Sequence, residues 1–161
     1  MSGEKIVSSG FSQDGTRMVI SYYDPACVRP FVLHQDRWAT LGKERKFPGA
    51  KFVAVDLSPD GRTVAAVRPD EDRVRLLALP DLVEKPLGIR VPRGSVAPTF
   101  SPDGRAVGVL VDKGSGRWEV HAGTPGGTSR MIQRFYGNPP PQILSWSFSA
   151  DGKTTDIVSH T

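Results

Sequence analysis

Short apolar runs alternate with polar turns along the whole chain, as at residues 63–67 and 106–111. Runs of this length, bounded by Gly, Pro and Asp, are typical of β-strands. Residues 73–79 begin with charged and apolar residues in alternation, Arg73-Val74-Arg75-Leu76, with the period of two that a half-buried strand requires. No segment of the sequence shows a helical period, so the pattern predicts an all-β chain.

The turns between these runs share one motif, in which an apolar residue is followed by Ser, one further residue, Asp and Gly. Successive copies begin 46, 43 and 48 residues apart. Asp can accept a hydrogen bond from the backbone of its own turn, and Gly tolerates positive φ. Asp-Gly between two apolar runs predicts a hairpin, and the period of the copies matches a four-stranded propeller blade. The four copies are Phe11-Ser12-Gln13-Asp14-Gly15, Leu57-Ser58-Pro59-Asp60-Gly61, Phe100-Ser101-Pro102-Asp103-Gly104 and Phe148-Ser149-Ala150-Asp151-Gly152.

Strand counting divides the chain into repeats whose strands we name A to D. Blade 1 spans about 5–42, blade 2 about 51–92 and blade 3 about 95–136, and strands A and B of a fourth blade span 143–161. The predicted fold class is therefore all-β, a partial β-propeller of three four-stranded blades plus the first hairpin of a fourth. The tract Asn138-Pro139-Pro140-Pro141 is expected to be a rigid spacer before the half blade.

Residues 52–82 resemble a WD40 blade and are equally similar to the Asp-rich repeats of bacterial TolB-type propellers. The Gly-His pair before strand A and the Trp-Asp pair after strand C, which typical WD40 blades carry, do not occur. The resemblance implies a propeller that recognises other proteins, or a gating domain such as TolB-like propellers form in prolyl-oligopeptidase-type peptidases. It is carried by Ser58-Pro59-Asp60-Gly61-Arg62-Thr63-Val64-Ala65-Ala66 and by Asp72-Arg73-Val74-Arg75-Leu76.

The strand count also predicts an open ring, because a propeller needs at least four blades to close. The chain begins at a strand A and ends after a strand B. A symmetric dimer would leave both junction blades without strands C and D, whereas a second polypeptide that begins with those strands would complete the half blade. The count therefore favours a hetero-assembly, or a split or truncated larger propeller, over a homo-oligomer.

Residues with the chemistry of catalysis or metal binding are sparse. His34, His121 and His160 fall in different repeats without ligand spacing, and Cys27 is the single cysteine. The sequence contains neither a Gly-x-Ser-x-Gly elbow nor a Gly-rich phosphate loop. The motif aspartates each occupy the same turn of a different blade, which indicates a structural role and not a carboxylate cluster. We therefore expect no catalytic residues, no metal, no cofactor and no enzyme activity.

Composition limits the class of protein. A chain of 161 residues with 24% charged residues and a net charge of +4 is globular in character. Its apolar runs are too short to cross a bilayer, and the first five residues lack the apolar run of a signal peptide. These features predict a cytoplasmic protein without membrane contact.

Positive charge gathers in the segments that join strand D of one blade to strand A of the next. Segments 43–51, 88–95 and 128–142 carry a net charge of +7 in a chain whose total is +4. In the blade topology of the family, these connections lie on the face opposite the Asp-Gly turns. We expect that face to bind an acidic protein or peptide, with nucleic acid less favoured because no nucleic-acid-binding motif occurs. The predicted binding residues are Lys43, Arg45, Lys46, Phe47, Arg90, Arg93, Arg130, Arg134 and Tyr136.

The sequence is compatible with three functions. The leading one is a non-catalytic protein–protein interaction scaffold or recognition module within a larger or multi-chain propeller. The alternative is a regulatory or gating propeller segment of a larger, peptidase-like enzyme. A lectin-like propeller is less favoured, because Trp38, Trp118 and Trp146 fall near different strands of their blades and do not form a repeated site.

Overall fold

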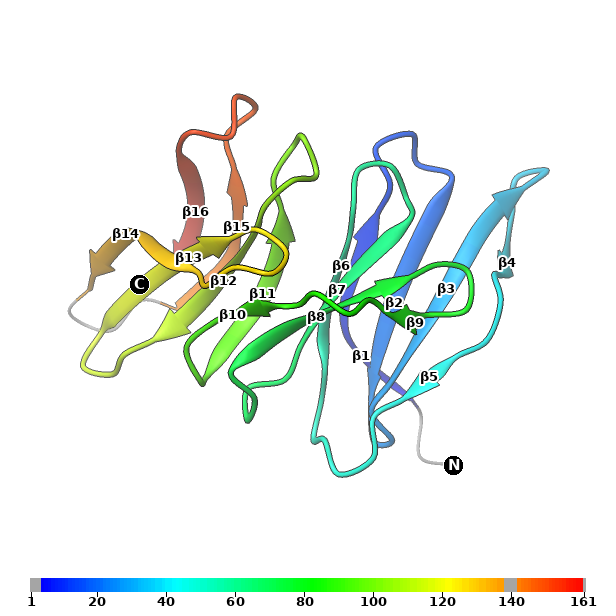
Figure 1. The fold of residues 1–161 in the computed structure, drawn as a ribbon, viewed down its shortest axis with the longest axis horizontal. Helices are drawn as coiled ribbons and strands as arrows, with labels where there is room; N and C mark the ends of the chain where they lie inside the picture. Colours follow the sequence, from blue (N-terminus) through cyan, green and yellow to red (C-terminus); the bar gives the residue numbers. More distant parts are fainter. Residues whose placement is uncertain (1–3, 138–141, 161) are drawn as a thin grey trace.

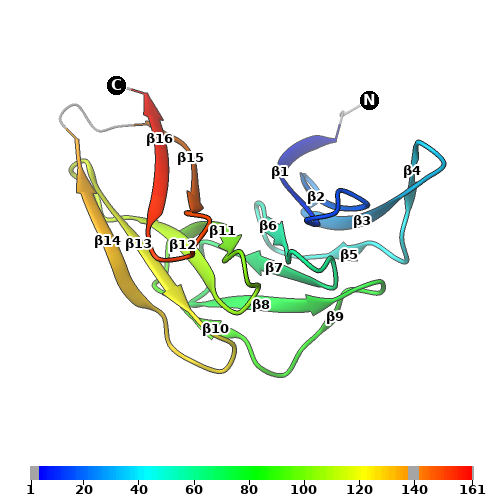
Figure 2. The ribbon, with the colours of Figure 1, turned by 90° about the horizontal axis from the view of Figure 1, so that it is seen from above.

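The computed structural model describes residues 4–137 and 142–160, and every regular element in these ranges is a β-strand. The sixteen strands of these ranges form four antiparallel sheets that follow one another along an arc (Figures 1 and 2). The predicted all-β partial propeller is therefore confirmed, while the predicted spacer at 138–141 lies outside the described residues. In the described ranges, no helix is long and apolar enough to cross a membrane.

Three of the sheets have the strand order of a blade, and the fourth is a hairpin. The first contains β1 (Lys5–Phe11), β2 (Arg17–Tyr23), β3 (Cys27–His34), β4 (Arg37–Thr40) and β5 (Arg45–Lys46). The second contains β6 (Ala54–Leu57), β7 (Thr63–Val67), β8 (Arg73–Ala78), β9 (Val83–Glu84) and β10 (Ile89–Arg90). The third contains β11 (Ser95–Phe100), β12 (Val107–Asp112), β13 (Arg117–Gly123) and β14 (Arg130–Tyr136), and the hairpin contains β15 (Gln142–Phe148) and β16 (Thr155–His160).

The outermost strand of blades 1 and 2 is broken into two short pieces. The sequence predicted one piece of each, at 38–41, which overlaps β4, and at 87–91, which contains β10. In blade 1, β4 and β5 both pair with β3. Between them, Gly42 adopts a φ of +72° and approaches the Pro80 carbonyl so closely that a Cβ would collide with it. The break therefore depends on a contact with the loop that follows β8 in the next blade.

The hydrophobic core lies between the blades, not within any one of them. Successive side chains of a strand point to opposite faces of the sheet. In β7, Val64 therefore packs with Val19 and the rest of the cluster toward blade 1, while Ala65 packs with Val109 and the cluster toward blade 3. The inner strands β1, β6, β11 and β15 contact one another in series along the concave side of the arc (Figure 2).

Each Ser-x-Asp-Gly turn is closed by the same hydrogen bonds. Ser58 Oγ donates to Asp60 Oδ1 at 2.6 Å and accepts the Thr63 N–H at 2.9 Å, while the same carboxylate oxygen accepts the Arg62 N–H at 3.0 Å. The Ser-to-Asp bond is also 2.6 Å long in the other three turns. These donors hold the pKa of the four turn carboxyls below the usual range, to about 2 for Asp14. The predicted structural role of the aspartates is confirmed, and all four turns lie along one edge of the arc, at the top of Figure 1.

Replacing one motif serine should destabilise its hairpin. Ser101 is 6% exposed, donates to Asp103 Oδ1 at 2.6 Å and accepts the Ala106 N–H at 3.0 Å. Ser101→Ala removes both bonds, so we expect it to lower the free energy of unfolding by about 1–3 kcal/mol in urea titrations. Ser159→Ala, at an exposed position of β16, is the matched control and should change the unfolding free energy by less than about 0.5 kcal/mol. Equal effects of the two substitutions would contradict the proposed role of the turn.

Candidate functional site

The face of blade 1 that points away from blade 2 is apolar and uncovered. Phe11 is 54% exposed and Trp38 41% exposed, and their rings meet edge to face with centroids 6.1 Å apart. Leu57 ends the corresponding strand of blade 2 and is 2% exposed, because blade 1 packs against it. Cross-strand pairing places a group of apolar side chains on this surface. We define the open face by six of them: Phe11, Met18, Ile20, Phe31, Leu33 and Trp38.

A cluster of ion pairs borders the open face. Arg29 lies opposite Ile20, donates to Glu4 at 2.7 and 2.8 Å and to Glu44 at 2.7 Å, and packs over the Tyr22 ring at 4.8 Å. These bonds lower the pKa of Glu4 and raise the pKa of Arg29. An apolar centre with a charged border is the usual anatomy of a protein–protein interface.

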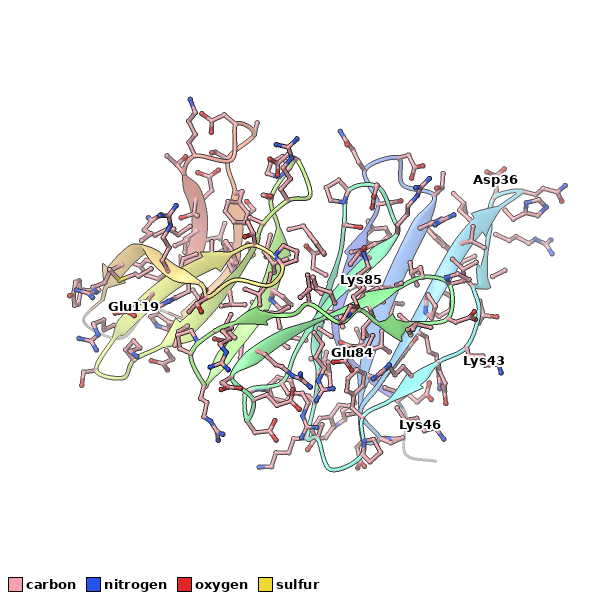
Figure 3. The ribbon with its side chains drawn as sticks, in the orientation of Figure 1. Asp36, Lys43, Lys46, Glu84, Lys85 and Glu119 are labelled. Carbon is pink, nitrogen blue, oxygen red and sulfur yellow. The ribbon has the colours of Figure 1, made fainter. Side chains whose placement is uncertain are left out.

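The nine predicted binding residues do not converge on one patch. They lie at the outermost strands and connections of three successive blades, and Figure 3 shows Lys43 and Lys46 beside blade 1, far from β14. Parts of these segments are strands: β10 and β14 lie where strands were predicted at 87–91 and 129–135, whereas β5 was not predicted. Seven of the nine are exposed: Lys43, Lys46, Arg90, Arg93, Arg130, Arg134 and Tyr136.

Several of the nine predicted residues have partners within the chain, among them Lys46, whose Nζ lies 3.8 Å from Glu44 Oε1. Phe47 is 6% exposed in the core between blades 1 and 2, so its predicted place on the surface is wrong. Arg45 donates to Glu84 at 3.0 Å and to the Leu82 carbonyl at 3.0 Å, which joins β5 to blade 2. Arg134 donates to Glu119 Oε1 at 3.1 Å on the neighbouring strand of blade 3.

Glu84 is the centre of the ion pairs between blades 1 and 2. It accepts Arg45 at 3.0 Å from blade 1 and Arg75 at 3.0 Å from its own blade, with Arg73 at 3.6 Å (Figure 3). The alternating charges of β8 were visible in the sequence, but their partner across the blade boundary was not. The charges of this cluster therefore serve the contact between blades.

A cavity of about 660 Å³ opens between blades 2 and 3 on the edge that carries the Asp-Gly turns. We call it the turn-side cavity. Lys85 stands at its wall and donates from Nζ to Thr63 Oγ1 at 2.7 Å (Figure 3). This edge is opposite the face that the charge pattern favoured. The cavity could not be predicted from the sequence because it forms between two repeats. Its lining includes Pro59, Asp60, Lys85, Leu87, Phe100, Pro102, Asp103 and Gly104.

Asp56 places a carboxyl group on the inner strand β6, between blades. Its Oδ2 accepts the Phe100 N–H of β11 at 2.8 Å, and Gly10 of β1 lies so close on the other side that a Cβ would contact the carboxylate. Burial raises the pKa of Asp56 to about 6, although the amides of Phe100 and Leu57 act in the opposite direction. The signal in the sequence was a single acidic residue within the apolar run 52–57.

No family model matches this chain, and no curated protein matches it. Among solved structures, it is similar to Kuenenia stuttgartiensis hydrazine synthase, with a TM-score of 0.68 and 16% identity over 96% of this chain and 43% of that one. It is also similar to a chain in the complex of KlAtg21 with the coiled coil of AgAtg16, with a TM-score of 0.55 and 17% identity over 83% and 42%. A eukaryotic initiation factor gives a TM-score of 0.55 and 15% identity over 83% and 34%. The chain spans less than half the length of each, and at these identities the likeness shows the fold alone.

Replacing Asp56 by Asn should stabilise the protein at neutral pH. Because the pKa of Asp56 is raised to about 6, its protonated form favours folding, and this stabilisation is lost as pH rises through 6. Asn keeps an acceptor for the Phe100 N–H without a buried charge. We expect Asp56→Asn to raise the unfolding free energy at pH 7.5 by about 2–3 kcal/mol and to flatten its dependence on pH between 4.5 and 7. An unchanged pH profile in urea titrations would contradict the assignment.

Proposed function

We propose that this chain is a non-catalytic recognition module that works within a larger or multi-chain propeller, with the open face of blade 1 as its principal protein-binding surface. The observation that carries the proposal is the difference between Phe11, 54% exposed, and Leu57, 2% exposed, at the same position of adjacent blades. Contiguous exposed apolar surface of this kind marks interaction sites in soluble proteins.

The partner that best fits the open face is another blade-like sheet. Met18 and Ile20 stand where Val64 and Ala66 stand in blade 2, and those two residues pack against the preceding blade. The covering surface would resemble the side of blade 1 that Val19 presents to blade 2. Small apolar side chains from strands A to C of a partner blade therefore meet the requirement.

The far side of the half blade argues against a second copy of this chain as that partner. Cross-strand pairing places Ser145 and Ser147 of β15 on that side, together with Asp156 and Val158 of β16. Head-to-tail closure of two copies would set this largely polar surface against the apolar open face. Because buried polar groups without partners are costly, this mismatch supports a hetero-assembly, or a split or truncated larger propeller, over a homo-oligomer.

The acidic partner predicted from the charge pattern fits as a second ligand, held by the exposed basic residues Lys43, Arg90, Arg93 and Arg130 at the blade rims. We also infer that the chain is a divergent relative of WD40 and TolB-type propellers. The inference is supported by four Ser-x-Asp-Gly turns with the same hydrogen bonds and by blade-like sheets in succession.

A photo-crosslinking amino acid at position 11 should capture the partner of the open face. With the crosslinker in place of Phe11, we expect one adduct after irradiation in the native host, and mass spectrometry should find repeated Ser-x-Asp-Gly turns in the captured polypeptide. The same crosslinker at Val83, which is 61% exposed but outside the open face, is the control and should not capture it. A chain that stays monomeric and forms no adduct at position 11 would contradict the proposal.

Charge reversal tests the acidic partner separately. Arg45 and Arg134 are unsuitable positions because their ion pairs with Glu84 and Glu119 belong to the fold. The combined variant Arg90→Glu, Arg93→Glu and Arg130→Glu should instead lower partner affinity by about tenfold or more at low salt. Calorimetry at two salt concentrations measures this, with Arg62→Glu on the turn side as the control. Unchanged affinity at low salt would remove the electrostatic contribution.

A further inference from the structure

The turn-side cavity has a filled counterpart one blade earlier. Arg17 follows the turn glycine of blade 1 by two residues, as Thr63 does in blade 2. Its side chain crosses toward the next turn, lies beside Gly61 and donates from Nη1 to the Gly61 carbonyl at 3.0 Å. An arginine side chain therefore bridges the boundary between blades 1 and 2 on this edge.

At the boundary between blades 2 and 3, the space that corresponds to the position of the Arg17 side chain is open. Thr63 stands in the place of Arg17 and Gly104 in the place of Gly61, and both residues line the turn-side cavity. A threonine side chain is too short to reach the next turn. The resulting volume of about 660 Å³ lies in the range that binding sites for small groups and side chains occupy.

The walls of this cavity suit a cation with an apolar stem. The charged residues of its lining are Asp60, Asp103 and Lys85, which together carry a net charge of −1. Lys85 is held at the Thr63 hydroxyl, on the blade 2 side. Pro59 and Pro102 supply rigid apolar surface, against which the methylenes and the planar guanidinium of an arginine can pack.

The next boundary along the chain is a less suitable site. A cavity of about 650 Å³ lies between blade 3 and the half blade, where Ala106 replaces Thr63. Its charged residues carry a net charge of +1, which opposes a further cation. They are Asp103, Asp151, Arg105, Arg130 and Lys153.

We infer that the turn-side cavity binds the side chain of an arginine presented by a partner peptide, in the way that Arg17 fills the preceding boundary. The guanidinium would donate to the Gly104 carbonyl and bring the charge of the cavity to neutral. The site is separate from the open face and does not depend on the function proposed above.

Titration with a blocked peptide Gly-Arg-Gly, followed by two-dimensional NMR, tests this inference on the full chain. We expect saturable shifts of the Leu87 and Gly104 amide signals with one site per chain. The same peptide with citrulline, which keeps the shape of arginine without its charge, should bind at least about tenfold more weakly. Equal binding of the two peptides, or tighter binding of Gly-Glu-Gly, would overturn the inference.

Substitutions within the cavity complete the test. Thr63→Arg should fill the cavity from within and abolish peptide binding, whereas Thr63→Ser, which keeps the acceptor of Lys85, should leave it unchanged. Lys85→Ala removes an exposed positive charge and should tighten binding several-fold, which keeps the test decisive if Thr63→Arg fails to fold.

Arg17→Ala should open a second site, at the boundary between blades 1 and 2, and raise the stoichiometry of peptide binding from one to two. Binding that persists in folded Thr63→Arg, or weakens in Lys85→Ala, would refute the assignment.

Discussion

The hydrogen bond from each motif serine to its aspartate is the constraint on which the rest of the molecule depends. It is 2.6 Å long in all four turns, and it fixes the register of the hairpin that follows. Each motif apolar residue pairs with the residue seven positions later, as Phe11 does with Met18 and Leu57 with Val64. A slip of one residue would turn every side chain of the strand to the opposite face. Because the core lies between blades, the turns decide which neighbour each strand packs against.

This local control explains why the fold could be predicted from the sequence. Strand β7 has the predicted bounds, Thr63–Val67, because its turn and its apolar run lie within ten residues of each other. The outermost strands of blades 1 and 2 were less predictable. Their breaks depend on contacts with the following blade, such as that of Gly42 with Pro80, which no local pattern encodes.

The candidate sites were predicted less well, for the same physical reason. A count of charges can find Arg45, Arg134 and the residues near them, but it cannot tell a free charge from one that Glu84 or Glu119 neutralises across a strand or blade boundary. Phe47 lay among basic residues in the sequence and yet belongs to the core. The turn-side cavity combines residues of two repeats, so it is defined by how the blades stack.

Because the blades repeat, the boundaries between them can be compared within one chain, and the comparison distinguishes the two surfaces that we propose as binding sites. The open face is exposed because blade 1 presents to solvent the positions that blades 2 and 3 bury. The turn-side cavity exists because a short side chain, Thr63, stands where blade 1 has Arg17. The first surface is a sheet face at one end of the arc, and the second lies on the turn edge between blades 2 and 3 (Figures 1 and 2). A blade that covers Phe11 would therefore leave the cavity open, so the two proposed partners are sterically compatible on one chain.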